Sequence, residues 1–179
     1  MIVPPALLRP LIVPASYWDD APFPAPRIQL ASDDLALTCV LLDNDSTMEY
    51  VTPAQAAEWA AGGMAWAEAA IAQLRLADDG LVWTHERRRD NGDLMWLGFM
   101  NPDGLGSSRL LLRSELERRF PAGYDIAMPD RSCGLAVTTL LDPEELADIL
   151  DLVGRMFDGA VTPMISDMRS PDCLTPVSP

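Results

Sequence analysis

Residues 124–158 read YDIAMPDRSCGLAVTTLLDPEELADILDLVGRMFD, and this stretch decides the expected fold. Residues 124–128 and 133–140 are apolar runs of the length of strands, and Pro129-Asp130-Arg131-Ser132 between them has the composition of a turn. Asp142-Pro143-Glu144-Glu145 then combines an N-cap, a proline at the first helical position and a capping box. Apolar residues follow at helical spacing to the end of the stretch. The order strand, turn, strand, helix is therefore predicted.

The same order recurs twice earlier in the chain. Asn91-Gly92 between two apolar runs is a strong hairpin signal, and Thr52-Pro53 followed by Gln55 predicts another capping box. The expected strands cover 35–42, 48–51, 81–86 and 94–100, and the expected helices cover 53–61, 64–74 and 108–120. We therefore predict an α+β fold with a mostly antiparallel sheet and helices covering one face.

Prolines concentrate at both ends of the chain. Seven of the sixteen lie before residue 27, and four more lie from Pro163 onward. Because proline interrupts both helices and the ladders of sheets, these ends are expected to be irregular. We predict a proline-rich arm over 1–26, a single domain over 27–160 and an irregular tail over 161–179. The ends are either flexible or arms that dock on a partner.

The negative charge of the chain argues against two classes of binding partner, nucleic acids and anionic membranes. Asp and Glu number 27 against 13 Lys and Arg, so the formal net charge is -14. Nucleic-acid binding needs a basic surface that displaces counterions from phosphates, and this composition argues against it. Docking on an anionic membrane surface is disfavoured for the same reason.

The cysteines and the histidine indicate neither a metal site nor a disulfide framework. Three cysteines (Cys39, Cys133 and Cys173) and one histidine, His85, do not form the ligand spacing of a structural zinc site. An odd number of cysteines without close pairs is typical of a reducing compartment. No apolar run reaches the roughly 18 residues of a membrane span. We therefore expect a cytoplasmic protein without a metal or cofactor.

No catalytic constellation is recognisable. His85 lies in a predicted strand and is expected to be a half-exposed strand residue, not a general base. Nucleophile-elbow, P-loop and dinucleotide-binding signatures are absent from the sequence. Asp43-Asn44-Asp45 resembles the start of a calcium loop but lacks its glycine and its distal glutamate. The glycine-bearing loop 101–107 is either an anion cradle before a helix or an ordinary strand-to-helix connection.

Two stretches resemble a known family. Residues 48–53 through Trp59, and Ser108-Arg109-Leu110-Leu111-Leu112 followed by Pro129-Asp130-Arg131, are similar to motifs of the YtpQ-like bacterial family of unknown function. The resemblance covers about residues 45–155 and departs from the family pattern at Ser132, where an acidic residue is expected. It implies no established activity, although some relatives occur beside secreted bacterial toxins.

The resemblance singles out Arg109 and Arg131. Each is either a structural arginine that satisfies carbonyls or a carboxylate, or a group that holds an anionic ligand or a partner's carboxylate. The acidic helix over 142–158 is likewise either a solvated face or a surface that attracts a basic partner.

Our first hypothesis is a non-catalytic acidic interaction protein, specifically an immunity protein that occludes a basic bacterial toxin or enzyme. The alternative is a small-ligand binder or enzyme that uses an arginine pocket, and a further alternative is a subunit of a larger assembly. The candidate partner- or ligand-binding residues are Arg109, Arg131, Asp130, Trp18, Asp43 and Asp45.

Overall fold

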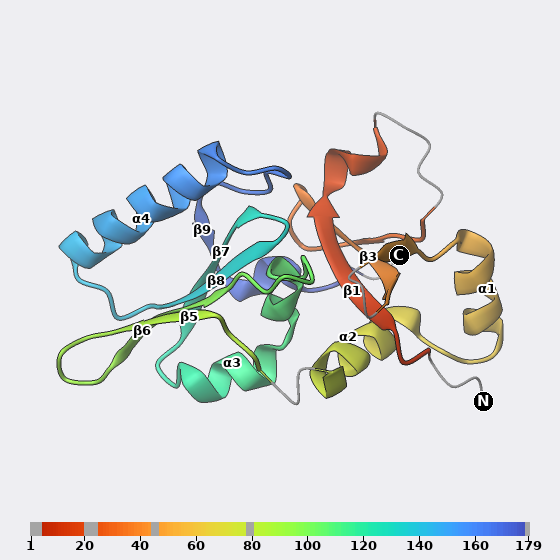
Figure 1. The fold of residues 1–179 in the computed structure, drawn as a ribbon, viewed down its shortest axis with the longest axis horizontal. Coiled ribbons are helices and arrows are strands. Elements are labelled where there is room, and N and C mark those ends of the chain that lie inside the picture. The colour runs from red at the N-terminus through yellow and green to blue at the C-terminus, as the bar shows by residue number, and fades with distance from the viewer. Residues whose placement is uncertain (1–4, 20–24, 44–46, 78–80, 178–179) are drawn as a thin grey trace. The chain divides into compact units, whose positions relative to one another are not determined.

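The structure is a computed structural model that describes residues 5–19, 25–43, 47–77 and 81–177 (Figure 1). The chain divides into two compact units. The first contains the described residues up to 77 together with 176–177, and the second is Leu81–Thr175. Each unit combines helices with one antiparallel sheet, so the α+β class is confirmed. The division near residue 80 differs from the single domain expected over 27–160.

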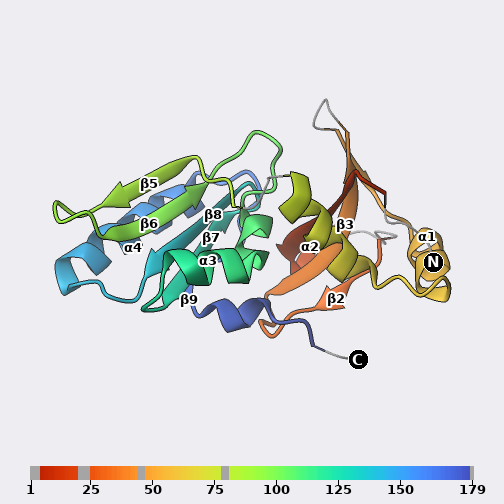
Figure 2. The ribbon, with the colours of Figure 1, turned by 90° about the horizontal axis from the view of Figure 1, so that it is seen from below.

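The first unit is built around one central strand. Its elements are β1 (Leu8–Pro14), η1 (Ala15–Trp18), β2 (Ile28–Gln29), β3 (Leu35–Leu42), β4 (Met48–Tyr50), α1 (Pro53–Ala61) and α2 (Trp66–Ala77). Strand β3 pairs antiparallel with β1, β2 and β4. Helix α2 packs on β1 and β3 (Figure 2). The core here includes Leu8, Cys39, Val51, Ala56, Trp59, Met64 and Ala70.

Strand β1 lies within the segment expected to be an irregular arm. It pairs with β3 along its whole length, from Leu8 opposite Leu41 to Pro14 opposite Leu35. The prolines are tolerated because β1 is at the edge of the sheet. The carbonyl of Leu7 accepts from the N–H of Leu42 in β3, and the N–H of Ala15 donates to the carbonyl of Asp34, just before β3. Odd-numbered residues therefore face the ladder, and even-numbered ones, including both prolines of β1, point their backbone nitrogens away from it. Proline content alone was therefore a misleading signal.

The second unit contains a five-stranded sheet. Its elements are β5 (His85–Arg88), β6 (Leu94–Phe99), η2 (Ser107–Leu111), α3 (Arg113–Arg119), β7 (Tyr124–Asp130), β8 (Cys133–Thr138), α4 (Pro143–Asp158), β9 (Met168–Arg169) and η3 (Pro171–Leu174). The strand order is β5-β6-β8-β7-β9, and every pairing is antiparallel. Strand β9 and the buried Leu174 show that part of the expected tail is folded.

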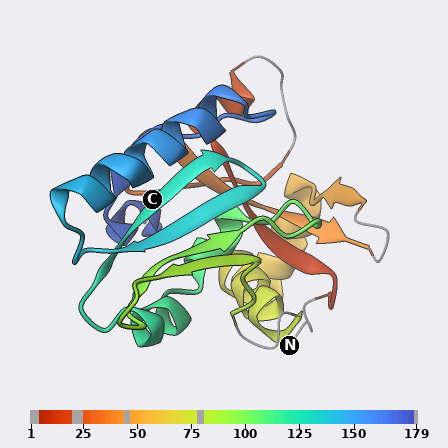
Figure 3. The same ribbon diagram turned by 60° about the vertical axis from the view of Figure 1, so that its left-hand side comes forward.

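Helices lie on both faces of this sheet (Figure 3). Leu135 and Val137 of β8 pack with Ile149 and Val153 of α4. Gly134, which precedes Leu135, faces the opposite side, where a Cβ atom would meet Gly106 and Ser107 at the start of η2. Successive residues of a strand point to opposite faces, so α4 covers one face and the η2 segment covers the other. The expected covering of one face holds for α4 alone.

The predicted helix over 108–120 is divided in two. Leu112 leaves the helical conformation (φ -80°, ψ 56°) between η2 and α3. It is fully buried, as are Leu110 and Leu116. Fully buried leucines therefore lie before, at and after the break.

Candidate functional site

A groove of about 480 Å³ lies between the β5–β6 hairpin and helix α4 of the second unit. It is lined by Arg87, Arg88, Arg89, Asp90, Asn91, Met95, Trp96, Glu145, Asp148 and Ile149. Strand β6 lies next to β8 in the sheet, and α4 packs against the same face that carries Trp96. The three consecutive arginines of the hairpin are thereby brought beside the acidic start of α4.

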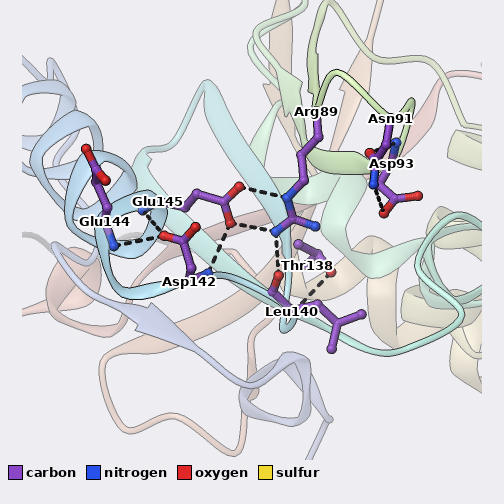
Figure 4. Close-up of polar contacts among 8 residues, drawn as sticks. All are labelled: Arg89, Asn91, Asp93, Thr138, Leu140, Asp142, Glu144 and Glu145. Atoms are coloured by element: carbon purple, nitrogen blue, oxygen red, sulfur yellow. Dashed lines mark hydrogen bonds and ion pairs between the residues drawn. The ribbon is translucent and has the colours of Figure 1, made fainter.

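Arg89 ties the hairpin to the start of α4 (Figure 4). Its Nε donates to Oε1 of Glu145 over 2.7 Å, and its Nη2 donates to Oε2 of Glu145 and to the carbonyl oxygen of Leu140. Glu145 also accepts from the backbone N–H of Asp142 over 3.0 Å, as the capping box predicted. One carboxylate therefore caps the helix and fixes the hairpin against it.

The ion pair makes stability depend on pH. Hydrogen bonding to Arg89 and to the N–H of Asp142 lowers the pKa of Glu145 from 4.5 to about 2. A depressed carboxyl pKa stabilises the fold above the unfolded value and loses that effect as pH falls through the folded value. We expect Glu145→Gln to lower the melting temperature at pH 7, with the difference from wild type shrinking between about pH 4.5 and pH 2. Thermal denaturation across this range tests it.

The control is Glu144→Gln, which removes the same charge from the same turn of α4. Glu144 is exposed, and it contacts the capping residue Asp142 through its backbone N–H only. A pH-dependent loss of equal size in both variants would contradict the role assigned to Glu145.

The groove continues along α4. A second cavity of about 340 Å³ shares Arg87, Trp96, Asp148 and Ile149 with the first. Among the described residues, the side chains of Arg87 and Asp148 take part in no hydrogen bond or ion pair. A cationic and an anionic group thus face the groove near the half-buried indole of Trp96, and both are available to a bound molecule.

The outward side of α4 combines carboxylates with exposed leucines, and we call it the α4 surface. Leu146 and Leu150, one turn apart, are 39% and 43% exposed. The exposed acidic residues of this surface are Glu144, Asp148, Asp151 and Asp158. Arg155 is the only basic residue of the helix, and it pairs with Asp151 over 2.8 Å. Two exposed leucines and four exposed carboxylates are thus carried by the same helix.

Arg109 is a buried structural residue. It is 2% exposed and forms a bidentate pair with Asp103, with Nη1–Oδ1 at 3.0 Å and Nη2–Oδ2 at 2.6 Å. Asp103 also accepts from the N–H of Leu105. Arg109 therefore holds the 101–107 loop closed on itself.

Arg131 and Asp130 lie in the turn between β7 and β8. The carboxylate of Asp130 accepts from the N–H groups of Ser132 and Thr162, each over 2.8 Å. Burial raises the pKa of Asp130, but hydrogen bonds from the Ser132 hydroxyl and from these N–H groups outweigh that effect and lower it. The Nε of Arg131 is buried without a hydrogen-bond partner among the described residues. The hydrogen bonds that the Asp130 carboxylate accepts therefore fix the conformation of the turn.

The glycine-bearing loop is close to this turn but is not an open anion cradle. The N–H of Ser107 donates to the carbonyl of Arg131 over 3.2 Å, and its hydroxyl donates to the carbonyls of Asp130 and Cys133. Gly106 packs so tightly that a Cβ atom would overlap the backbone of Ser132. The structure thus brings the predicted loop and arginines together, and these contacts connect the loop to the sheet.

The other predicted site residues belong to the first unit. Trp18 is half-buried at the end of η1, with the guanidinium of Arg27 5.6 Å from its ring centroid. Asp43 accepts from the N–H of Thr47 over 2.9 Å, which closes the β3–β4 turn. Asp45 lies outside the described residues. In the second unit, His85 is exposed on the edge strand and contacts Thr84.

Sequence reasoning identified the hairpin around Asn91-Gly92 and the acidic helix separately and did not assign Trp96 or Asp148 to a site. No local sequence signal indicates that the hairpin and α4 lie together, because the groove between them depends on the order of strands in the sheet. Arg87-Arg88-Arg89, a run of three like charges at the hairpin, was the sequence feature that could have indicated the groove.

No family model, curated protein or solved structure matches this chain. The resemblance to the YtpQ-like family stays a prediction.

In the part of the chain that the structure describes, no three His, Cys, Asp or Glu side chains gather as a metal site would require. No helix formed by the described residues combines the length and the apolar character needed to span a membrane.

Proposed function

We propose that the chain is a non-catalytic interaction protein of the immunity type, which binds a basic bacterial toxin or enzyme through its α4 surface. The observation that carries this proposal is the exposure of Leu146 and Leu150 among four carboxylates on one helix. A few well-buried anchor residues supply most of the energy of a protein interface, and surrounding charges select and attract the partner.

The net charge of -14 supports the same class of partner. A strongly negative protein attracts basic proteins over several ångströms at physiological salt and increases the association rate. The anion-pocket alternative is less well supported, because Arg109 is engaged with Asp103 in a buried pair.

We further propose that binding takes place in the cytoplasm. All three cysteines are free thiols, and Cys39 and Cys133 are buried. Burial raises the pKa of both thiols to about 12, so neither is a reactive thiolate at neutral pH. Unpaired cysteines of this kind are typical of a reducing compartment.

The test is site-specific photocrosslinking of the full chain in its host cells. A crosslinking amino acid at Ala147, on the outward side of α4, should capture one basic protein that the same probe at Leu76 of α2 does not capture. Leu76 is a suitable control because it is 71% exposed on a helix of the other unit. The captured protein is then purified, and its activity is measured with and without this chain.

We expect the chain to inhibit that activity, and Asp148→Arg with Asp151→Arg to weaken inhibition at least about tenfold through like-charge repulsion. The matched control is Glu49→Arg with Glu58→Arg, two exposed acidic residues of the first unit. Capture of the same proteins at both probe positions, or a captured protein whose activity is unaffected, would refute the proposal.

A further inference from the structure

The groove between the β5–β6 hairpin and α4 is lined by charges of both signs in equal number. Its first cavity has Arg87, Arg88 and Arg89 against Asp90, Glu145 and Asp148. Its second cavity has Arg87 and Arg155 against Asp148 and Asp151. This balance contrasts with the net charge of -14 of the whole chain. A cleft with both signs on its walls is complementary to a molecule that carries both signs itself, more than to a simple anion or cation.

The arginines of the groove differ in whether they already have a partner. Three of them form ion pairs with carboxylates, which are Arg88–Glu86, Arg89–Glu145 and Arg155–Asp151. The fourth is Arg87, whose side chain forms no such contact among the described residues. After the hydrogen bond from Arg89, the charge of Arg87 contributes at longer range to the lowered pKa of Glu145. Its N–H donors are left for a ligand.

Asp148 is the matching carboxylate on the other wall. It lines both cavities together with Arg87, whereas Asp90 lines only the first. No ion pair joins Asp148 to Arg87 in the part of the chain that the structure describes, because one residue is carried by α4 and the other by β5. The groove thus holds a cation and an anion that face the same space without meeting.

The half-buried indole of Trp96 lines both cavities between these two charges. Arg87 lies directly opposite Trp96 in the β5–β6 ladder, so the two side chains share a face of the sheet. Trp96 packs against the core cluster that includes Ile149 of α4, the residue after Asp148. Arg87 and Asp148 are both exposed, so a molecule in the groove reaches both side chains as well as the indole.

We propose that this groove binds a small zwitterion with an aromatic side chain, of the chemical class of a free aromatic amino acid. Its carboxylate accepts hydrogen bonds from Arg87, its ammonium group donates to Asp148, and its ring packs on the indole of Trp96. The cavity of about 480 Å³ has the size of a small-molecule site. The inference does not rest on the proposed function, since Leu146 and Leu150 line neither cavity.

The experiment is isothermal titration of the full chain with L-phenylalanine at pH 7 in 0.15 M salt, a concentration that weakens attraction to exposed charges. Two analogues are titrated in parallel. Phenethylamine lacks the carboxylate, and hydrocinnamate lacks the ammonium group. We expect one site for L-phenylalanine, with affinity at least about tenfold higher than for either analogue, as for one hydrogen bond between charged groups.

Two variants assign each end of the ligand to its residue. Arg87→Gln should weaken binding of L-phenylalanine about tenfold and leave phenethylamine unchanged, because that analogue has no carboxylate for Arg87 to bind. Asp148→Asn should likewise weaken L-phenylalanine and leave hydrocinnamate unchanged. The charge-matched controls are Arg118→Gln and Glu144→Gln, which change exposed residues that line neither cavity and should not affect binding.

The proposal is overturned if L-phenylalanine does not bind, or if either analogue binds as tightly as L-phenylalanine does. Phenethylamine as the tighter ligand would indicate a plain cation site, and hydrocinnamate a plain anion site. Equal weakening by Arg87→Gln and Arg118→Gln, or by Asp148→Asn and Glu144→Gln, would also overturn it. Arg87 lies outside the α4 surface, so failure of this proposal is distinguishable from failure to capture a protein through α4.

Discussion

Gly106→Ala will destabilise the second unit by about 3 kcal/mol or more, the largest loss expected from adding one methyl group at any glycine that the structure describes. The reason is close packing, since Gly106 has ordinary helical angles (φ -53°, ψ -53°) that any residue adopts. A Cβ atom there would overlap the carbonyl oxygens of Phe99 and Ser132. Both belong to the backbone of the sheet or its turn, and neither moves without breaking strand pairing.

The matched control is Gly154→Ala in α4, where a Cβ atom meets nothing within 4 Å. Alanine is about 1 kcal/mol better than glycine in a helix, so this variant should gain stability. Chemical denaturation of both variants measures the two effects. Overpacking of a core is expected to cost about 1–3 kcal/mol. If Gly106→Ala lowers the free energy of unfolding by less than about 1 kcal/mol, the loop shifts to accommodate the methyl group and the prediction is wrong.

Asp103→Ala will cost about 3–5 kcal/mol, because it removes the carboxylate that balances a buried guanidinium. The side chain of Arg109 is 3% exposed, and both of its hydrogen bonds to Asp103 would be lost. The loop would also lose the acceptor of the Leu105 N–H. Denaturant unfolding monitored by circular dichroism measures the loss.

Two controls distinguish a buried ion pair from a general effect of charge. Asp151→Ala breaks an exposed pair on α4, with side chains 64% and 69% exposed, and should cost less than about 1 kcal/mol. The double variant Asp103→Ala with Arg109→Met should be more stable than Asp103→Ala alone, since no buried charge is left uncompensated. If the double variant is the less stable of the two, Arg109 stabilises the loop through contacts other than this pair.

The elements that the sequence predicted well are those with strong short-range signals. Both predicted capping boxes are present, at Thr52 with Gln55 and at Asp142 with Glu145. The turn around Asn91-Gly92 connects β5 and β6 as expected. In each case the decisive contacts join residues within four positions of one another, so the local sequence contains the whole interaction.

The predictions that differ from the structure involved distant partners. Prolines near the start predicted an arm, yet β1 is stabilised by pairing with β3 some thirty residues away, at the edge position where proline is tolerated. The helix over 108–120 breaks at Leu112, whose backbone leaves the helical conformation between η2 and α3. Neither outcome has a local signature.

The sequence by itself determined the α+β class, the two capped helices, the hairpin and the acidic character, since composition and near-neighbour geometry encode these properties. Only the tertiary structure decided that Arg89 meets Glu145, 56 residues later, and that Arg109 is engaged with Asp103 inside the protein. The physical reason is that burial and ion pairing depend on which strands become neighbours, and strand order is set by the packing of the whole unit.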